Sequence, residues 1–198
     1  MLKLNKKYKS GTALSILQEA ILFSDIQGEI TQNEIALSLG TSRMPVREAL
    51  ISLEYQGLIM RLPSQHIKVI TFTNDNIRNI FHDLAVLEID ALEHWNNDNI
   101  ENLLSCKMQT DFHQKIIEHS NTALRKKVLD ILINIYLAFV LKHSQSLYKI
   151  EAMFIKLLSS ISFPIDLDII KINYDNYCGI LADELIKIRN EKKVYSEC

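Results

Sequence analysis

Residues 36–58 read ALSLGTSRMPVREALISLEYQGL, and this stretch decides the fold of the N-terminal part of the chain. Ala36, Leu37 and Leu39 give a short helix an apolar face. Gly40 then supplies the left-handed residue that ends this helix and turns the chain. The stretch therefore predicts a helix-turn-helix, in which a second helix begins almost directly after the glycine.

The second helix is expected to have one buried face and one exposed end. Ser42 can cap its N-terminus, and Pro45 is tolerated because it falls in the first turn. A buried stripe at helical spacing is predicted from Val46, Ala49, Leu50 and Leu53. Arg43 and Arg47 lie off this stripe, one turn apart, at the end where recognition helices contact base edges and phosphates in the major groove of DNA.

A short β-ribbon is predicted after the second helix. Residues 58–61 and 67–71 are β-prone runs, and the turn-forming segment 63–66 separates them. Before the first helix of the pair, Thr31 and Glu34 have the spacing of a capping box, which predicts where that helix starts. This order of helices and strands is that of a winged helix-turn-helix.

The segment 39–50, followed by 53–59, resembles the winged-helix signature of GntR-type bacterial transcription regulators. The resemblance covers residues 10 to about 70 and implies sequence-specific binding to double-stranded DNA. The wing tip of that family usually carries Arg-Gly, whereas this chain has Gln65 and His66, so its wing contacts are expected to be weaker or differently aimed. The residues predicted to contact DNA are Ser42, Arg43, Met44, Pro45, Arg47, Gln65, His66 and Lys68.

The charge of the chain is unevenly distributed. The formal net charge is −2, made up of +2 in residues 1–70 and −4 in residues 71–198. The cations of the first part all belong to the predicted winged-helix unit, where they can line one face and displace counterions from phosphates; they are Lys3, Lys6, Lys7, Lys9, Arg43, Arg47, Arg61 and Lys68.

Cysteine usage, hydropathy and motifs predict a cytoplasmic protein that is not an enzyme. Cys106, Cys178 and Cys198 form no Cys-x-x-Cys motif and no even disulfide framework, as expected in a reducing compartment. The most apolar later segment, Val128–Leu141, contains Asp130 and is shorter than the roughly 20 residues of a membrane span. Because Gly-rich phosphate loops and hydrolase motifs are also absent from the sequence, we expect no cofactor and no membrane association.

Beyond Thr73 the sequence predicts an all-helical domain, since long amphipathic segments follow one another and Gly179 is the only glycine there. The fold class is therefore mostly α, with a winged helix-turn-helix domain at residues 1–72 and a helical bundle at 73–198. The expected helices are 74–95, 99–120, 122–143, 145–162 and 166–193.

The helical part resembles, more weakly, the FadR-type or FCD effector domain, through Leu87-Glu88 and Phe112-His113. In many FCD domains an Asp and a His at i, i+4, together with two later His, hold a divalent metal, because residues four apart share a helix face. Here Gln109 stands at the Asp position, and Phe154 aligns where a later ligand would be. His113 alone fits the ligand set, so no metal is predicted.

Two alternatives remain open for the helical domain. It either binds a small-molecule effector in a pocket to which Gln109, His113 and His82 contribute polar groups, or it serves only dimerisation or protein–protein interaction. Dimerisation is expected in both cases, because one small module reads only a few base pairs and a two-fold pair on a palindromic operator restores specificity. The helix at 128–141 is a candidate for that contact.

Overall fold

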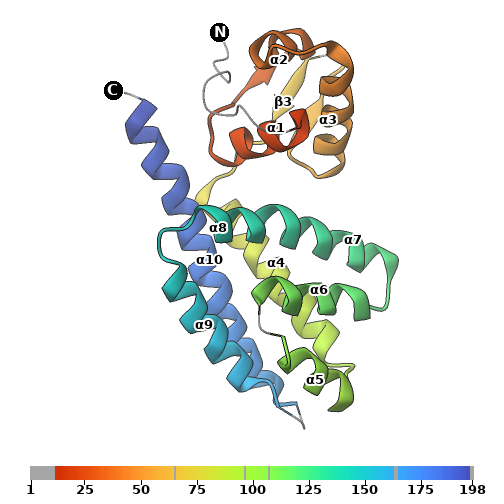
Figure 1. Cartoon of the computed structure of the whole chain (residues 1–198), viewed down its shortest axis with the longest axis vertical. Coiled ribbons are helices and arrows are strands. Elements are labelled where there is room, and N and C mark those ends of the chain that lie inside the picture. The colour runs from red at the N-terminus through yellow and green to blue at the C-terminus, as the bar shows by residue number, and fades with distance from the viewer. Residues whose placement is uncertain (1–11, 65, 96, 107, 163–164, 197–198) are drawn as a thin grey trace. The chain divides into compact units, whose positions relative to one another are not determined.

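The computed structural model describes residues 12–64, 66–95, 97–106, 108–162 and 165–196. The chain divides into two compact units (Figure 1). The first contains the residues up to Phe72 together with those from Arg189 onward, and the second runs from Thr73 to Ile188.

The first unit contains three helices and a small sheet within its described residues. Their order is α1 (Ala13–Leu22), β1 (Glu29–Ile30), α2 (Gln32–Leu39), α3 (Arg43–Tyr55), β2 (Ile59–Arg61) and β3 (Ile67–Val69). The strands are antiparallel in the order β1-β3-β2, and Lys68 pairs with Glu29 on one side and Met60 on the other. The helix-turn-helix is α2 and α3, and the ribbon predicted as the wing is β2 and β3.

Local signals place the ends of these helices. The capping box at α2 is complete, with the Glu34 backbone N–H donating to Thr31 Oγ1 (3.2 Å) and the Thr31 N–H donating to Glu34 Oε2 (2.7 Å). The Thr31 hydroxyl also donates to Glu34 Oε2 (2.8 Å), and this bond, together with the one from the Thr31 backbone N–H, lowers the pKa of Glu34, which keeps its charge at the helix N-terminus. Gly40 ends α2 in the left-handed region with φ 63°.

The core of the first unit shows one error in the sequence-based prediction. The stripe of α3 is buried as expected, and α1 and β-strand residues such as Leu17 and Ile67 pack with it. Leu37, however, was predicted to lie on the apolar face of α2 and is 77% exposed. Ile35 and Ala36 supply the buried side instead, and Leu37 lies about 200° around the helix from the fully buried Ile35, on the opposite face.

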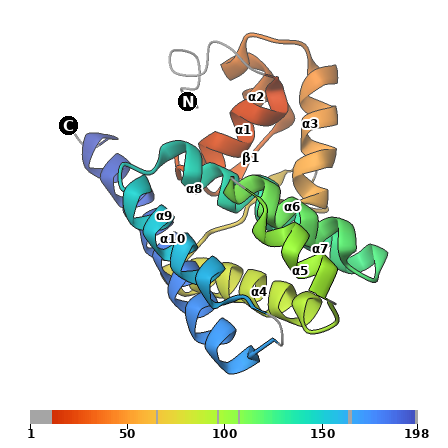
Figure 2. The same cartoon turned by 60° about the horizontal axis from the view of Figure 1, so that its bottom comes forward.

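The second unit is helical throughout its regular elements. It contains α4 (Asn74–Leu92), α5 (Asn97–Leu104), α6 (Gln109–His119), α7 (Ala123–Ile131), the π-helix η1 (Leu132–Leu137), α8 (Ala138–His143), α9 (Leu147–Ser160) and most of α10 (Leu167–Ser196). Helices α6 and α7 lie side by side (Figures 1 and 2). The mostly α fold class is confirmed, but the single helix expected at 99–120 is wrong, since the chain forms α5 and α6 there.

The helix expected at 122–143 is continuous, but its middle is a π-helix. Between Leu132 and Val140 nearly every side chain is buried, and Asn134 is the exposed exception. A helix buried on all sides lies inside its bundle rather than at its surface. The segment 128–141, which the sequence offered as a dimer contact, therefore uses most of its apolar surface within its own unit. Among the described residues, no helix is long and apolar enough to cross a membrane.

Candidate nucleic-acid interface and a buried polar cluster

A groove of about 740 Å³ opens between the N-terminal ends of α2 and α3 and the β2–β3 ribbon. The stripe that α3 buries in the core turns Arg43 and Arg47 outward, and both side chains are exposed along this groove. Gln32 Nε2 donates to the Arg43 backbone carbonyl (2.8 Å), which ties the start of α2 to the start of α3. The groove therefore combines two helix N-termini with a cationic wall, an arrangement suited to phosphate and base-edge contacts.

The predicted DNA-contacting residues fall into three groups. Those that line the groove are Arg43, Met44, Arg47 and His66, and His66 Nδ1 lies 3.1 Å from Ser64 Oγ. Ser42 is exposed and Pro45 half-buried at the start of α3, while Lys68 is exposed on β3 outside the groove lining. Gln65 lies outside the described residues.

The groove lining also contains residues outside the predicted DNA-contacting set, among them Gln32 and Asn33, and Arg61, which the sequence analysis named only among the cations of this unit. The capping box placed Gln32 and Asn33 in the first turn of α2, and a helix-turn-helix brings that turn next to the start of α3, so the signal was present. Arg61 differs from the other arginines, because its Nε donates to Glu54 Oε2 at 2.7 Å and is locally neutralised. Within the described part of the chain, Arg43 and Arg47 form no ion pair, so both keep their charge for a ligand.

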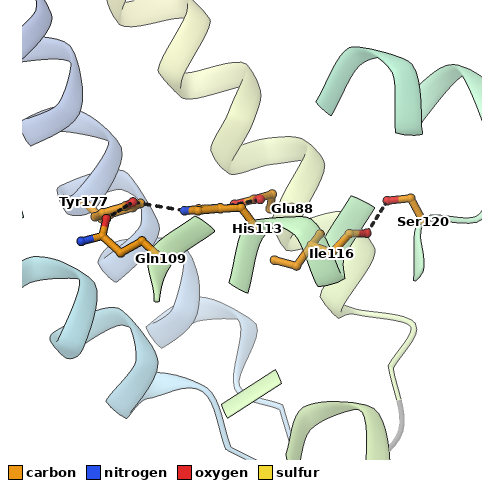
Figure 3. A network of polar contacts seen from close by, with 6 residues as sticks. All are labelled: Glu88, Gln109, His113, Ile116, Ser120 and Tyr177. Atoms are coloured by element: carbon orange, nitrogen blue, oxygen red, sulfur yellow. Dashed lines mark hydrogen bonds and ion pairs between the residues drawn. The ribbon is translucent and has the colours of Figure 1, made fainter. Parts of the chain in front are cut away.

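The second unit contains a buried chain of hydrogen bonds that joins α4, α6 and α10 (Figure 3). His113 Nδ1 lies 2.7 and 2.9 Å from the two carboxylate oxygens of Glu88, and His113 Nε2 lies 3.1 Å from the Tyr177 hydroxyl. The Tyr177 hydroxyl donates to Gln109 Oε1 at 2.9 Å. Glu88, His113 and Tyr177 are fully buried, whereas Gln109 is half-buried and ends the chain towards the surface.

Both ring nitrogens of His113 are engaged in this cluster. Nδ1 faces the Glu88 carboxyl group, and Nε2 faces the Tyr177 hydroxyl, which itself donates to Gln109. The imidazole is therefore the polar partner of the Glu88 carboxyl group in the interior. Burial raises the pKa of Tyr177 well above its usual range, so its hydroxyl keeps the proton that it donates.

The metal site of FCD domains does not fit these residues. Both nitrogens of His113 are occupied by Glu88 and Tyr177, and the rings that face it from the later helices are Phe154 at 6.2 Å and Tyr177 at 5.9 Å between centroids. Phe154 offers no donor atom, and the Tyr177 hydroxyl remains neutral. Within the residues that the structure describes, no three His, Cys, Asp or Glu side chains group to hold a metal.

Chelation is therefore expected to leave the thermal stability of the protein unchanged. Dialysis against EDTA should not shift the melting temperature, because no folding free energy is linked to a bound ion. Elemental analysis of the purified protein provides the parallel measurement. One equivalent of zinc, nickel or manganese per chain, lost together with stability on His113→Ala, would show that the ligand helices had been misaligned.

The three residues predicted for an effector pocket are not brought to one place. Gln109 and His113 belong to the hydrogen-bonded cluster, and Gln109 also lines a cleft beside α9. His82 lines a different cleft, shared with Arg78, Asp175 and other residues of α4 and α10. Tyr177 was not singled out in the sequence, although it is the residue that links His113 to Gln109.

Of the two units, the first is the one that a family model matches. A family model described as "Bacterial regulatory proteins, gntR family" matches residues 26–69, which contain the helix-turn-helix and the wing. No curated protein matches the chain.

Several solved structures are similar to this chain at low sequence identity. Lar, which controls the expression of the Listeria monocytogenes agr system, has a TM-score of 0.55 and 12% identity over 92% of this chain and 99% of its own. McbR/YncC from E. coli has a TM-score of 0.46 and 16% identity over 91% and 96% of the two chains. A GntR family member from Pseudomonas syringae pv. tomato has a TM-score of 0.43 and 18% identity over 93% and 89%. Of the three, Lar has a TM-score above 0.5, and its likeness concerns the fold alone.

Proposed function

We propose that the chain is a transcription regulator that acts as a homodimer on a palindromic operator, because residues 26–69 match the family model described as "Bacterial regulatory proteins, gntR family". The observation that carries the proposal is the groove in which Arg43 and Arg47 are exposed at the start of α3 and form no ion pair with any residue that the structure describes. Arginine at this end of a recognition helix can bind guanine O6 and N7 with two hydrogen bonds. The remaining contacts would come from Ser42, Met44, Pro45, Gln65, His66 and Lys68.

The dimer is proposed because one winged helix buries too little DNA to select an operator by itself. A single module reads a few base pairs, and each mismatched pair costs only about 1 to 3 kcal/mol, so useful specificity needs two half-sites. We assign DNA binding to residues 1–72 and dimerisation to the helical residues 73–198. The protein would act in the cytoplasm, where bacterial DNA is found.

The full-length protein is expected to sediment with twice the 22.8 kDa mass of one chain, both free and on its operator. Operators selected from a random duplex pool should contain two inverted half-sites whose centres are about one helical turn, or 10 base pairs, apart, or a multiple of that spacing. A monomer at micromolar concentration that selects a single unrepeated half-site would contradict the proposal.

A small-molecule effector is a second element of the proposal. The interior cluster is closed around His113, but Gln109 connects it to a cleft on the surface of the helical unit. The alternative is an effector-independent regulator whose helical unit serves only dimerisation or protein–protein interaction. A binding experiment on that cleft distinguishes these two functions.

A further inference from the structure

We propose that the cleft between the start of α6, the end of α8 and α9 binds a neutral, largely apolar molecule that carries a carbonyl group. The cleft has a volume of about 360 Å³, which lies within the usual range for small-molecule sites. The role of the bound molecule as an effector rests on the proposed function. Its binding to the cleft can be measured without DNA.

The walls of the cleft are apolar side chains from several elements. Met108 precedes α6, Leu141 lies near the end of α8, and Leu147, Phe154 and Ile155 come from α9. Three of them remain substantially exposed: Met108 at 60%, Leu147 at 41% and Ile155 at 61%. A hydrocarbon chain laid in the cleft would cover this surface and gain the free energy of removing it from water.

Gln109 contributes a side-chain amide to the lining of the cleft. Its Oε1 accepts from the Tyr177 hydroxyl, and its Nε2 points away from Tyr177 (Figure 3). Because the amide oxygen is already engaged, the amide offers its N–H donors to an occupant. A ligand that meets this group must accept a hydrogen bond.

The charge of the described lining disfavours an acid as that acceptor. Among the described residues that line the cleft, Glu151 is the only ionisable one, and its exposed carboxylate would repel a carboxylate ligand. In the cluster behind Gln109, His113 pairs with Glu88, and neither of these two residues lines the cleft. Lys149, the next cation along α9, places its ammonium 5.9 Å from the Tyr148 ring centroid and does not line the cleft. An acceptor without negative charge, such as a ketone, ester or amide, satisfies both conditions.

Three probes of equal chain length test the proposal: 2-octanone, octanoate and octylammonium. Saturation-transfer difference NMR on the full-length protein measures the dissociation constant of each. We expect 2-octanone to bind about tenfold more tightly than either ion. Its carbonyl oxygen can accept a hydrogen bond from Gln109 and has no charge. Octanoate can accept the hydrogen bond but is repelled by Glu151, and octylammonium has no acceptor. Octanoate or octylammonium binding as tightly as 2-octanone, or failure of all three to bind, would overturn the assignment.

Matched variants test whether Gln109 and Glu151 determine the selectivity or whether the probes bind by nonspecific hydrophobic contact. Glu151→Gln should bring octanoate to within about threefold of 2-octanone, while the exposed Glu93→Gln, which lies outside the cleft, should change neither. Gln109→Met should weaken 2-octanone about tenfold, and Gln114→Met on an exposed position of the same helix should not. Unchanged selectivity in Glu151→Gln or Gln109→Met would refute the roles given to these residues.

A last variant locates the binding. Leu147→Trp fills the cleft from a partly exposed position, where folding should be retained, and circular dichroism melting checks that it is. It should abolish 2-octanone binding, and persistence of binding would place the probe elsewhere. Gel shifts on the same variants report DNA binding separately, so that loss of the ligand site and failure of the proposed regulator function give different results.

Discussion

Replacing His113 by leucine is expected to lower the free energy of unfolding by about 3 to 5 kcal/mol, the largest change that we predict for a single substitution. His113 and Glu88 are both fully buried, and the imidazole donates to the carboxylate at 2.7 Å. Leucine fills much of the imidazole volume but leaves the fully buried Glu88 carboxyl group without its polar partner. Urea denaturation followed by circular dichroism measures the loss.

Two variants show whether the unpaired charge is the cause. His113→Leu combined with Glu88→Met removes both charges and should recover most of the lost stability, because an apolar pair of similar volume has no charge to desolvate. His82→Leu changes an exposed histidine on α4 and should stay within about 0.5 kcal/mol of the wild type. A double variant no more stable than His113→Leu would point to lost packing rather than to the buried carboxylate.

Replacing Arg43 by alanine is expected to weaken operator binding by about 1 to 3 kcal/mol, or roughly 5- to 150-fold. The guanidinium is exposed at the first position of α3, on the groove and free of ion pairs within the described residues. A base contact would make the loss larger on the selected operator than on random DNA. Gel-shift titrations of both duplexes at one salt concentration measure the two affinities.

The control for this substitution is Arg78→Ala. Arg78 belongs to α4 and pairs with Asp183 at 2.8 Å within the helical unit, so its removal should leave DNA affinity unchanged. Equal losses on operator and random DNA would make Arg43 a phosphate contact. No loss on either duplex would exclude the docking of α3 that we propose.

Elements governed by neighbouring residues were predictable from the sequence. The capping box of α2, the left-handed Gly40 and the buried stripe of α3 each depend on residues within one or two turns of one another. The strands β2 and β3 lie within the two predicted runs for the same reason, since their turn residues separate them in sequence. The third strand, β1, was missed because two residues contain no periodicity.

The break between α5 and α6 could not be predicted, because residues 105–108 contain neither Gly nor Pro. Side chains end α5 instead. Ser105 Oγ donates to the Asn102 carbonyl oxygen at 2.6 Å, and Lys115 Nζ donates to the same oxygen at 2.6 Å. Lys115 comes from α6, so the signal that stops one helix lies on the next one.

In the candidate sites, too, features set by residues close in the sequence were predictable, and features set by distant residues were not. Arg43 and Arg47 could be placed from helical spacing alone, as could the neighbourhood of Gln109 and His113 on one helix. The partner that connects the latter two, Tyr177, is 64 residues from His113 and is brought there only by the packing of α10. Long-range pairing of this kind leaves no mark in the local pattern of a single sequence.

The π-helix between α7 and α8 lets this part of the chain hold one residue more than a regular helix of the same span. A π-turn holds one residue more than an α-turn over nearly the same span, so η1 accommodates that residue while α8 stays in phase with the core. Removing one residue from 132–137 would turn the π-turn into an α-turn and leave Phe139 and Val140 facing the interior, whereas adding one would rotate both by about 100° about the helix axis. Homologous chains with this bundle should therefore be able to lack one residue here, where the helix stays regular, but not to gain one.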